Sequence, residues 1–196
     1  MKKFLFSVFA FCFIAQSAFA QDLITLRTLP MAVDEFVYMR NGMANSPEGG
    51  ASVFIAALLI YSKDKNVGMK CLTIALDSTR LTSGSTYKGF TPDASAAKMF
   101  VSLAEKSKSF IPYSYITGTH PDRDYVAKLP YVLEYEKTSK TFRSENDATI
   151  FIKTSGDQLP RAIYLKRNDK GIWKVIKFDE VMKNVTQPYH KKGDDL

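Results

Sequence analysis

The sequence predicts an α+β domain, in which an N-terminal layer of about three helices packs on a C-terminal antiparallel sheet of four to five strands. Two observations predict this class. Apolar residues recur at helical spacing in the first half of the chain, whereas short aromatic-rich stretches separated by turn residues follow from residue 110 onward. Helices grouped ahead of hairpin-linked strands are typical of an antiparallel sheet covered by helices.

The strongest helix start lies at residues 45–50, with the sequence NSPEGG. Ser46 suits the N-cap, Pro47 suits the first helical position, and Glu48 places a carboxylate at the positive end of the helix dipole. The apolar run 53–61 that follows is too short to span a membrane and predicts a buried core helix. The two glycines favour close packing of a capped helix. Alternatively, with Glu48, they leave a ligand site at the helix start.

Further helices are expected over about 67–77 and after the Thr-Pro-Asp sequence at 91–93, which repeats the capping pattern. Residues 31–43 are consistent with either a strand or a short helix, and the sequence does not decide between them. Residues 21–186 are expected to form one domain, since this length is ample for a core, and 187–196 are expected to be a polar, disordered tail.

Strands are predicted over 110–116, 131–136, 148–153, 161–166 and 172–178. The last two are joined by a polar, glycine-containing loop that suits a tight hairpin. Tyr113 and Tyr115 alternate along the first strand, as Tyr131 and Tyr135 do along the second, so each pair shares a face. Such a face can bind a sugar or a peptide. The alternative is that these rings belong to the sheet core, with their hydroxyls at its rim.

Residues 1–20 have the three parts of a secretory signal peptide. Two lysines near the start precede an apolar run over 4–15, and the Ala-Phe-Ala sequence of 18–20 then supplies small residues. A membrane anchor would need about 20 apolar residues, so a cleaved signal is expected instead. Cleavage between Ala20 and Gln21 delivers the chain to the periplasm or the cell exterior without a transmembrane segment.

Charge and cysteine content narrow the classes of partner. The formal net charge of +7 becomes +5 when Lys2 and Lys3 are removed with the signal. Because the charges are scattered and the chain is expected to be exported, no nucleic-acid partner is predicted. A weak contact with anionic envelope surfaces is the alternative to an ordinary solvated surface.

Once Cys12 is removed with the signal peptide, Cys71 lacks a disulfide partner, and its apolar neighbours indicate a buried thiol.

The densest polar cluster is the loop 119–125, with the sequence THPDRDY. His120, Asp122 and Asp124 are residue types that can ligate a metal or form an acid–base pair. The set is too small for a metal site and no nucleophile motif accompanies it, so we predict no metal, no cofactor and no catalytic residue. A solvated Pro-Asp-Arg-Asp turn with a local ion pair, within which Arg123 lies, is the main interpretation, and ligand binding by the side chains of this loop is the alternative.

Distinctive stretches are NSPEGG at 45–50, GMKCLTIALD at 68–77, YKGF at 87–90, IPYSY at 111–115 and the hairpin of 160–175. Together they make the region from about residue 45 to residue 178 resemble a family of uncharacterised exported bacterial proteins, a domain of unknown function. The resemblance implies one shared domain and a bacterial exported setting, and it implies no activity.

The leading hypothesis is therefore a non-enzymatic exported domain that binds an unidentified protein or a small ligand. Its candidate contacts are Tyr113 and Tyr115 on the sheet face, the side chains of 120–124, and Glu48 at the helix start. The alternative is a small hydrolase or lyase in which His120 acts as the base. A third hypothesis is a structural component held at the envelope by its basic surface.

Overall fold

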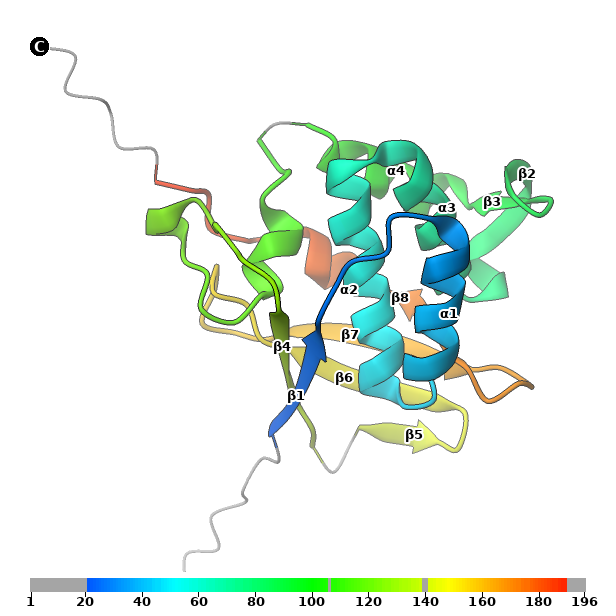
Figure 1. Cartoon of the computed structure of the whole chain (residues 1–196). Helices are drawn as coiled ribbons and strands as arrows, with labels where there is room; N and C mark the ends of the chain where they lie inside the picture. The colour runs from blue at the N-terminus through cyan, green and yellow to red at the C-terminus, as the bar shows by residue number, and fades with distance from the viewer. Residues whose placement is uncertain (1–20, 106, 139–140, 190–196) are drawn as a thin grey trace, which may run out of the picture.

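The computed structural model describes residues 21–105, 107–138 and 141–189 (Figure 1). The predicted signal peptide, residues 1–20, lies outside this part of the chain, as do residues 190–196 of the predicted tail. Within the described ranges, no helix combines the length and the apolar character that crossing a bilayer requires.

The α+β class predicted from the sequence is confirmed. The α-helices are α1 (Val33–Met43), α2 (Pro47–Lys63), α3 (Lys65–Ala75) and α4 (Ala94–Leu103). The strands are β1 (Gln21–Leu26), β2 (Leu81–Tyr87), β3 (Phe90–Pro92), β4 (Tyr131–Glu136), β5 (Phe142–Ser144), β6 (Asp147–Ile152), β7 (Arg161–Arg167) and β8 (Trp173–Lys177). Short 3-10 helices are η1 (Ser78–Arg80), η2 (Ile111–Tyr115), η3 (Pro121–Arg123) and η4 (Asp179–Met182).

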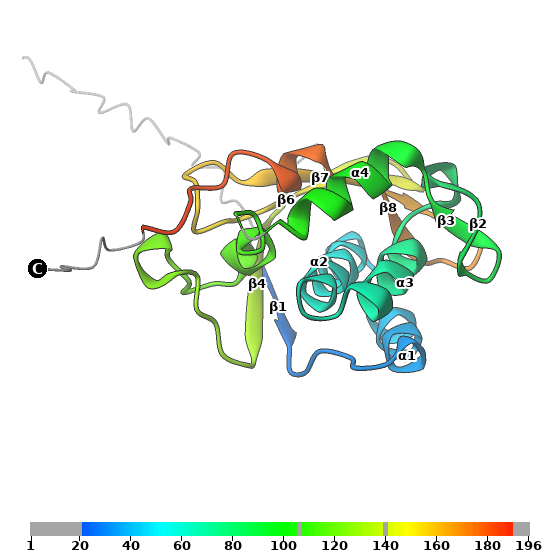
Figure 2. The same cartoon turned by 90° about the horizontal axis from the view of Figure 1, so that it is seen from above.

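The main sheet is antiparallel, with the order β1-β4-β6-β7-β8 and with β5 added beside β6. One of its strands comes from the N-terminal end of the chain, because β1 pairs with β4 from Gln21↔Glu136 to Leu26↔Tyr131. Strands β2 and β3 form a separate hairpin. Seen from above, the sheet curves so that α2 lies between β4 on one side and α3 on the other (Figure 2).

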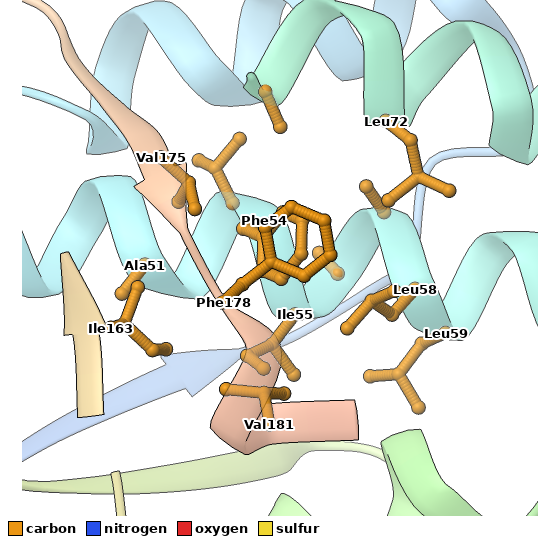
Figure 3. Packing of buried hydrophobic residues seen from close by; sticks show 14 of the residues in the cluster. Ala51, Phe54, Ile55, Leu58, Leu59, Leu72, Ile163, Val175, Phe178 and Val181 are labelled. Atoms are coloured by element: carbon orange, nitrogen blue, oxygen red, sulfur yellow. The ribbon is translucent and has the colours of Figure 1, made fainter. Parts of the chain in front are cut away.

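Helix α2 is the centre of the core. Every residue from Pro47 to Tyr61 is buried, which confirms the predicted core helix. The Phe54 ring lies 4.9 Å from that of Phe178 and 6.3 Å from that of Phe100, between centroids. Figure 3 shows Phe54 against Phe178 with aliphatic side chains around them. Such aromatic contacts add to the free energy gained by burying the rings.

The predicted cap forms at the start of α2, whereas Thr91 and Pro92 lie in β3 and Asp93 is the N-cap of α4. Ser46 Oγ accepts a hydrogen bond of 3.1 Å from Gly49 N, and Asp93 Oδ1 accepts one of 2.8 Å from Ala96 N. A single residue, Asp64, separates α2 from α3, and its carboxylate accepts hydrogen bonds from the first turn of α3. These side-chain acceptors satisfy amides that a helix leaves without partners at its N-terminus.

The prediction of a strand over 110–116 is wrong, because this segment forms the 3-10 helix η2. Pro112 has no N–H to give to a strand ladder, which limits it to sheet edges and turns. Ser114 Oγ donates to Ile111 O at 2.7 Å, a local bond that closes the turn. The undecided segment 31–43 contains helix α1, with Asp34 and Glu35 in its first turn.

The thiol of Cys71 is fully buried in α3, and its burial, together with the charge of Asp64, raises its pKa to about 12. Because the thiolate is the reactive form, the folded protein should leave an aromatic disulfide reagent unreacted. We expect labelling of Cys71 only when urea unfolds the chain, as measured by absorbance or mass spectrometry. Rapid labelling without denaturant would show that α3 opens readily from α2.

Candidate functional site

Glu48 lies in the first turn of α2 and is only 3% exposed. Its Oε1 lies 3.0 Å from Lys137 Nζ, and Lys137 also pairs with the carboxylate of Asp22. The carboxylate therefore links α2 to β1 and to the residue that follows β4. These contacts are those of a cross-element ion pair inside the fold.

The two glycines after Glu48 are required by close packing. A Cβ atom at Gly49 would overlap the carbonyl oxygen of Met43, and one at Gly50 would lie 2.7 Å from Trp173 O. Gly50 N also donates to Ser46 O at 2.9 Å. The geometry at this helix start therefore favours the packed, capped helix over an open anion site.

The predicted loop is an exposed turn around η3. His120 is its N-cap: Nδ1 accepts a hydrogen bond of 3.3 Å from Asp122 N and lies 3.1 Å from the Asp122 carboxylate. The two side chains are 49% and 61% exposed. Arg123 Nη2 donates to Gly118 O, and Asp124 adopts the left-handed conformation at the end of the turn. These contacts of His120, Asp122 and Arg123 all join residues within five positions of one another, so they are local to the turn.

Glu48 and the loop form separate ion pairs among the described residues. The charged contacts of Glu48 are with Lys137 and, through it, with Asp22, whereas the charged contact of His120 is with Asp122. Within the described ranges, no group of three or more histidine, cysteine, aspartate or glutamate side chains is arranged to hold a metal ion. The candidate residues are thus divided between two separate places in the fold.

Tyr113 and Tyr115 lie on η2 rather than on a strand. Tyr115 is 1% exposed, its hydroxyl donates to Val181 O at 2.8 Å, and burial raises its pKa far above that of an exposed tyrosine. Tyr113 is half-buried and accepts a hydrogen bond from Ser62. Tyr131 and Tyr135 are also buried. Tyr131 and Tyr135 do share one face of β4, which is buried in the core, whereas the strand face expected for Tyr113 and Tyr115 does not form.

The side-chain hydroxyls around η2 are engaged in hydrogen bonds with backbone carbonyl groups and with one another. Ser114 Oγ donates to Ile111 O, and Thr119 Oγ1 lies 2.8 Å from Ile116 O and 2.7 Å from Ser155 Oγ. Ser155 Oγ in turn donates to Ser114 O. This network, in which Ser155 N also donates to Ser114 O at 2.9 Å, ties η2 to the segment after β6.

The structure also contains a groove that the sequence analysis did not predict. It has a volume of about 1230 Å³ and lies between the segment after β1, one side of α1 and the junction of α2 with α3. In Figure 2 the segment from β1 to α1 runs past α2. We call it the β1–α1 groove; its lining residues are Thr25, Leu26, Arg27, Thr28, Leu29, Pro30, Met31, Asp34, Glu35, Tyr38, Met39, Met43, Ile60, Lys63, Asp64, Val67 and Leu129.

The β1–α1 groove has an apolar surface with charged residues among its lining. Leu26 and Ile60 are buried in its floor, whereas Met31 and Tyr38 are 86% and 84% exposed and Leu129 is 47% exposed. Exposed apolar side chains gathered at one hollow mark an interaction site more often than scattered ones do. The charged lining residues are Arg27, Lys63, Asp34, Glu35 and Asp64.

One wall of the groove has backbone groups without hydrogen bonds. The β1–β4 ladder ends at Leu26, and no backbone hydrogen bond within the described ranges involves residues 27–29. Leu29 precedes Pro30, which favours an extended backbone at that position. Beyond it, Met31 N donates to Glu35 Oε2 at 2.8 Å and so fixes the segment to α1. The wall therefore offers free N–H and C=O groups beside an apolar hollow.

The sequence contained weak signals for this site. Pro30 followed by Asp34 and Glu35 is a helix-start pattern, and Arg40 suits the last turn. Along α1, which lies wholly within the described part of the chain, Phe36 is the only fully buried residue. The other apolar residues of the helix are half-buried, except for the exposed Tyr38, and periodicity alone does not distinguish a groove wall from core.

Residues 28–189 match a domain of unknown function, DUF6935. The chain belongs to the DUF6935 family. The expected membership of a family of unknown function is thereby confirmed. The DUF6935 match begins at Thr28, just after β1, so it includes every lining residue of the groove except Thr25, Leu26 and Arg27. No curated protein and no solved structure matches the chain.

Proposed function

We propose that this DUF6935 protein is an exported binding module whose β1–α1 groove holds an extended, apolar segment of another protein. The observation that carries the proposal is the exposure of Met31 and Tyr38, at 86% and 84%, over a hollow of about 1230 Å³. Water contact with so much apolar surface is unfavourable, and a partner side chain in the groove would remove it.

The free backbone of residues 27–29 supports a peptide as the occupant. A peptide laid along this wall gains main-chain hydrogen bonds and places alternate side chains in the groove, as in other cases of strand addition. A compact apolar ligand or an acyl chain fills the hollow but leaves those N–H and C=O groups unused. The peptide therefore makes better use of what the groove offers.

The side chains suggest the kind of segment that binds. Met31, Met39 and Met43 are flexible and polarizable, so they adapt to apolar side chains of different shapes. Three carboxylates against two cations line the groove, so a segment with a basic residue beside its apolar ones is favoured.

Export is part of the proposal and rests on residues 1–20. In the structure, β1 begins at Gln21, so cleavage after Ala20 leaves the sheet intact.

The alternative, a hydrolase or lyase with His120 as base, has weaker support, since Nδ1 caps an exposed turn and the hydroxyls of Ser114 and Thr119 bond to backbone carbonyls.

The test is peptide selection followed by affinity measurement. The chain from Gln21 is used to select from a displayed random-peptide library, and the selected peptides are labelled for fluorescence anisotropy. We expect peptides with alternating apolar residues, and we expect Met31→Asp or Tyr38→Asp to weaken binding at least tenfold, roughly 1.4 kcal/mol. Both sites are on the surface, so thermal stability should change little.

Val101→Asp is the matched control, because Val101 is 59% exposed on α4 and does not line the groove. Its affinity for the selected peptides should equal that of the unmodified chain. Equal affinities for all three variants would place the peptide site elsewhere. A different outcome would identify an acyl chain as the ligand. In that case the library would yield no peptide, whereas a fluorescent fatty acid would bind the unmodified chain and would not bind Met31→Asp.

A further inference from the structure

A second surface, independent of the groove, lies on the face of the sheet turned away from α2. At its centre is Tyr164 of β7, which is half-buried. The Arg143 guanidinium lies 5.1 Å from the Tyr164 ring centroid, and Lys177 Nζ lies 5.2 Å from it. Cations held over an aromatic face in this way are stabilised by the negative potential of the ring.

Strand register puts these residues on one face. Tyr164 pairs with Lys177 of β8 and with Thr149 of β6, and β5, which carries Arg143, lies beside β6. Lys166 is two residues beyond Tyr164, so its side chain leaves the same face. We call Arg143, Tyr164, Lys166 and Lys177 the basic face; Figure 1 shows its strands β5, β7 and β8, together with β6, which lies between β5 and β7.

The cations of the basic face have no carboxylate partner. Within the described ranges, none of Arg143, Lys166 and Lys177 forms an ion pair. The nearby Asp147 is opposite Lys166 in register, and its carboxylate accepts a hydrogen bond from Ser144 Oγ. The positive potential of the face is therefore only partly offset by neighbouring groups.

The other half of the same sheet face is different. There, Lys153 Nζ lies 2.6 Å from Glu134 Oε1 and 3.6 Å from Glu136 Oε1. This cation is neutralised, and the carboxylates exceed it in number. Among the described strands, the unpaired positive charge of this face is thus gathered on β5, β7 and β8.

We propose that the basic face binds anionic phospholipid head groups and lets the protein lie sheet-first on a membrane surface. Its cations come from three strands of one open sheet face, and two of them lie over one ring. Cations distributed over several strands match the many phosphates of a lipid surface, where each nearby cation contributes to binding. A nucleic acid would instead need a groove or exposed stacking platforms that follow one strand.

Co-sedimentation with vesicles tests the proposal. The chain from Gln21 is mixed with vesicles of phosphatidylcholine alone, or of phosphatidylcholine with phosphatidylglycerol. We expect binding only to the second kind, with loss of binding as salt rises, because salt screens exposed charges. The variant Arg143→Gln/Lys166→Gln/Lys177→Gln should lower the partition coefficient roughly fivefold for each cation removed.

The matched control is Lys65→Gln/Lys98→Gln/Lys183→Gln, which removes three exposed lysines of α3, α4 and the segment after η4. Both triple variants have the same net charge, so a smaller loss in the control assigns binding to the face. Equal losses, or no binding to phosphatidylglycerol vesicles at low salt, would overturn the proposal.

Two further measurements keep the result specific. Anisotropy with a labelled single-stranded oligonucleotide should show weaker binding than the vesicles do, and the reverse order would assign the face to nucleic acid. Val101→Gln, which changes no charge, should leave vesicle binding unchanged, since Val101 is exposed on α4 and is not part of the basic face. Circular dichroism melting of each variant confirms that it is folded before its binding is compared.

Discussion

Replacing Gly68 with alanine is expected to lower the free energy of unfolding by about 3 kcal/mol. A Cβ atom at this position would lie 2.2 Å from Tyr61 Cα and 2.4 Å from Tyr61 N. These are backbone atoms of α2, so relief requires α3 to move away from α2 rather than one side chain to rotate. Urea unfolding followed by circular dichroism measures the loss.

Gly42→Ala is the matched control for this experiment. Gly42 lies in α1, and a Cβ atom there would meet nothing within 4 Å. Alanine is the better helix former, so we expect a gain of roughly 0.5–1 kcal/mol. If Gly68→Ala behaved like Gly42→Ala, the backbones of α2 and α3 would not be in close contact at Tyr61.

The α2–α3 contact also shapes the β1–α1 groove. Gly68 follows Val67, and Tyr61 follows Ile60, and both Val67 and Ile60 line the groove. Moving α3 away from α2 therefore changes the floor of the groove. Gly68→Ala should thus weaken binding of the selected peptides even under conditions in which the variant remains folded.

The parts of the fold that were predictable are those with local causes. The caps at Ser46 and Asp93 depend on side chains within one turn of the helix start. The predicted bounds of β4 agree with the structure, because buried and half-buried residues alternate along Tyr131–Glu136. Periodicity and capping operate over a few residues and can be read directly from the sequence.

The parts that were not predictable depend on distant residues. Pairing of β1 with β4 brings Leu26 opposite Tyr131, and no local pattern near Leu26 specifies that partner. The segment 110–116 has the aromatic content of a strand, but its residues pack as η2 against α2. β-propensity depends on such surroundings more than helix propensity does.

The candidate site shows the same division. The loop around His120 was predicted as a local turn, and its contacts are local. The β1–α1 groove requires three separate stretches of chain to meet: residues 25–43, the α2–α3 junction and Leu129. The exposure of Met31 and Tyr38 follows from how α1 packs on α2 and α3, which no single stretch of sequence specifies.

Replacing Tyr115 with alanine should destabilise the protein by about 4 kcal/mol, because it empties a fully buried aromatic site. Tyr115→Phe removes only the hydroxyl bond of 2.8 Å to Val181 O and should cost about 1 kcal/mol. Tyr38→Ala, at a residue that is 84% exposed, should alter stability by less than roughly 0.5 kcal/mol. Urea unfolding measures all three.

The three tyrosine variants separate a core role from a binding role. Peptide affinity should fall for Tyr38→Ala and remain unchanged for Tyr115→Phe, since Tyr38 lines the groove and Tyr115 does not. If Tyr115→Ala instead kept its stability but lost affinity for the peptide, the binding surface would include Tyr115, as the sequence analysis inferred. The buried ring of Tyr115 cannot contact a partner unless η2 unfolds. A single result for Tyr115→Ala therefore cannot agree both with a core role and with a binding role. Comparing the loss of stability with the loss of peptide affinity at Tyr38 and at Tyr115 therefore shows which of the two residues belongs to the binding surface.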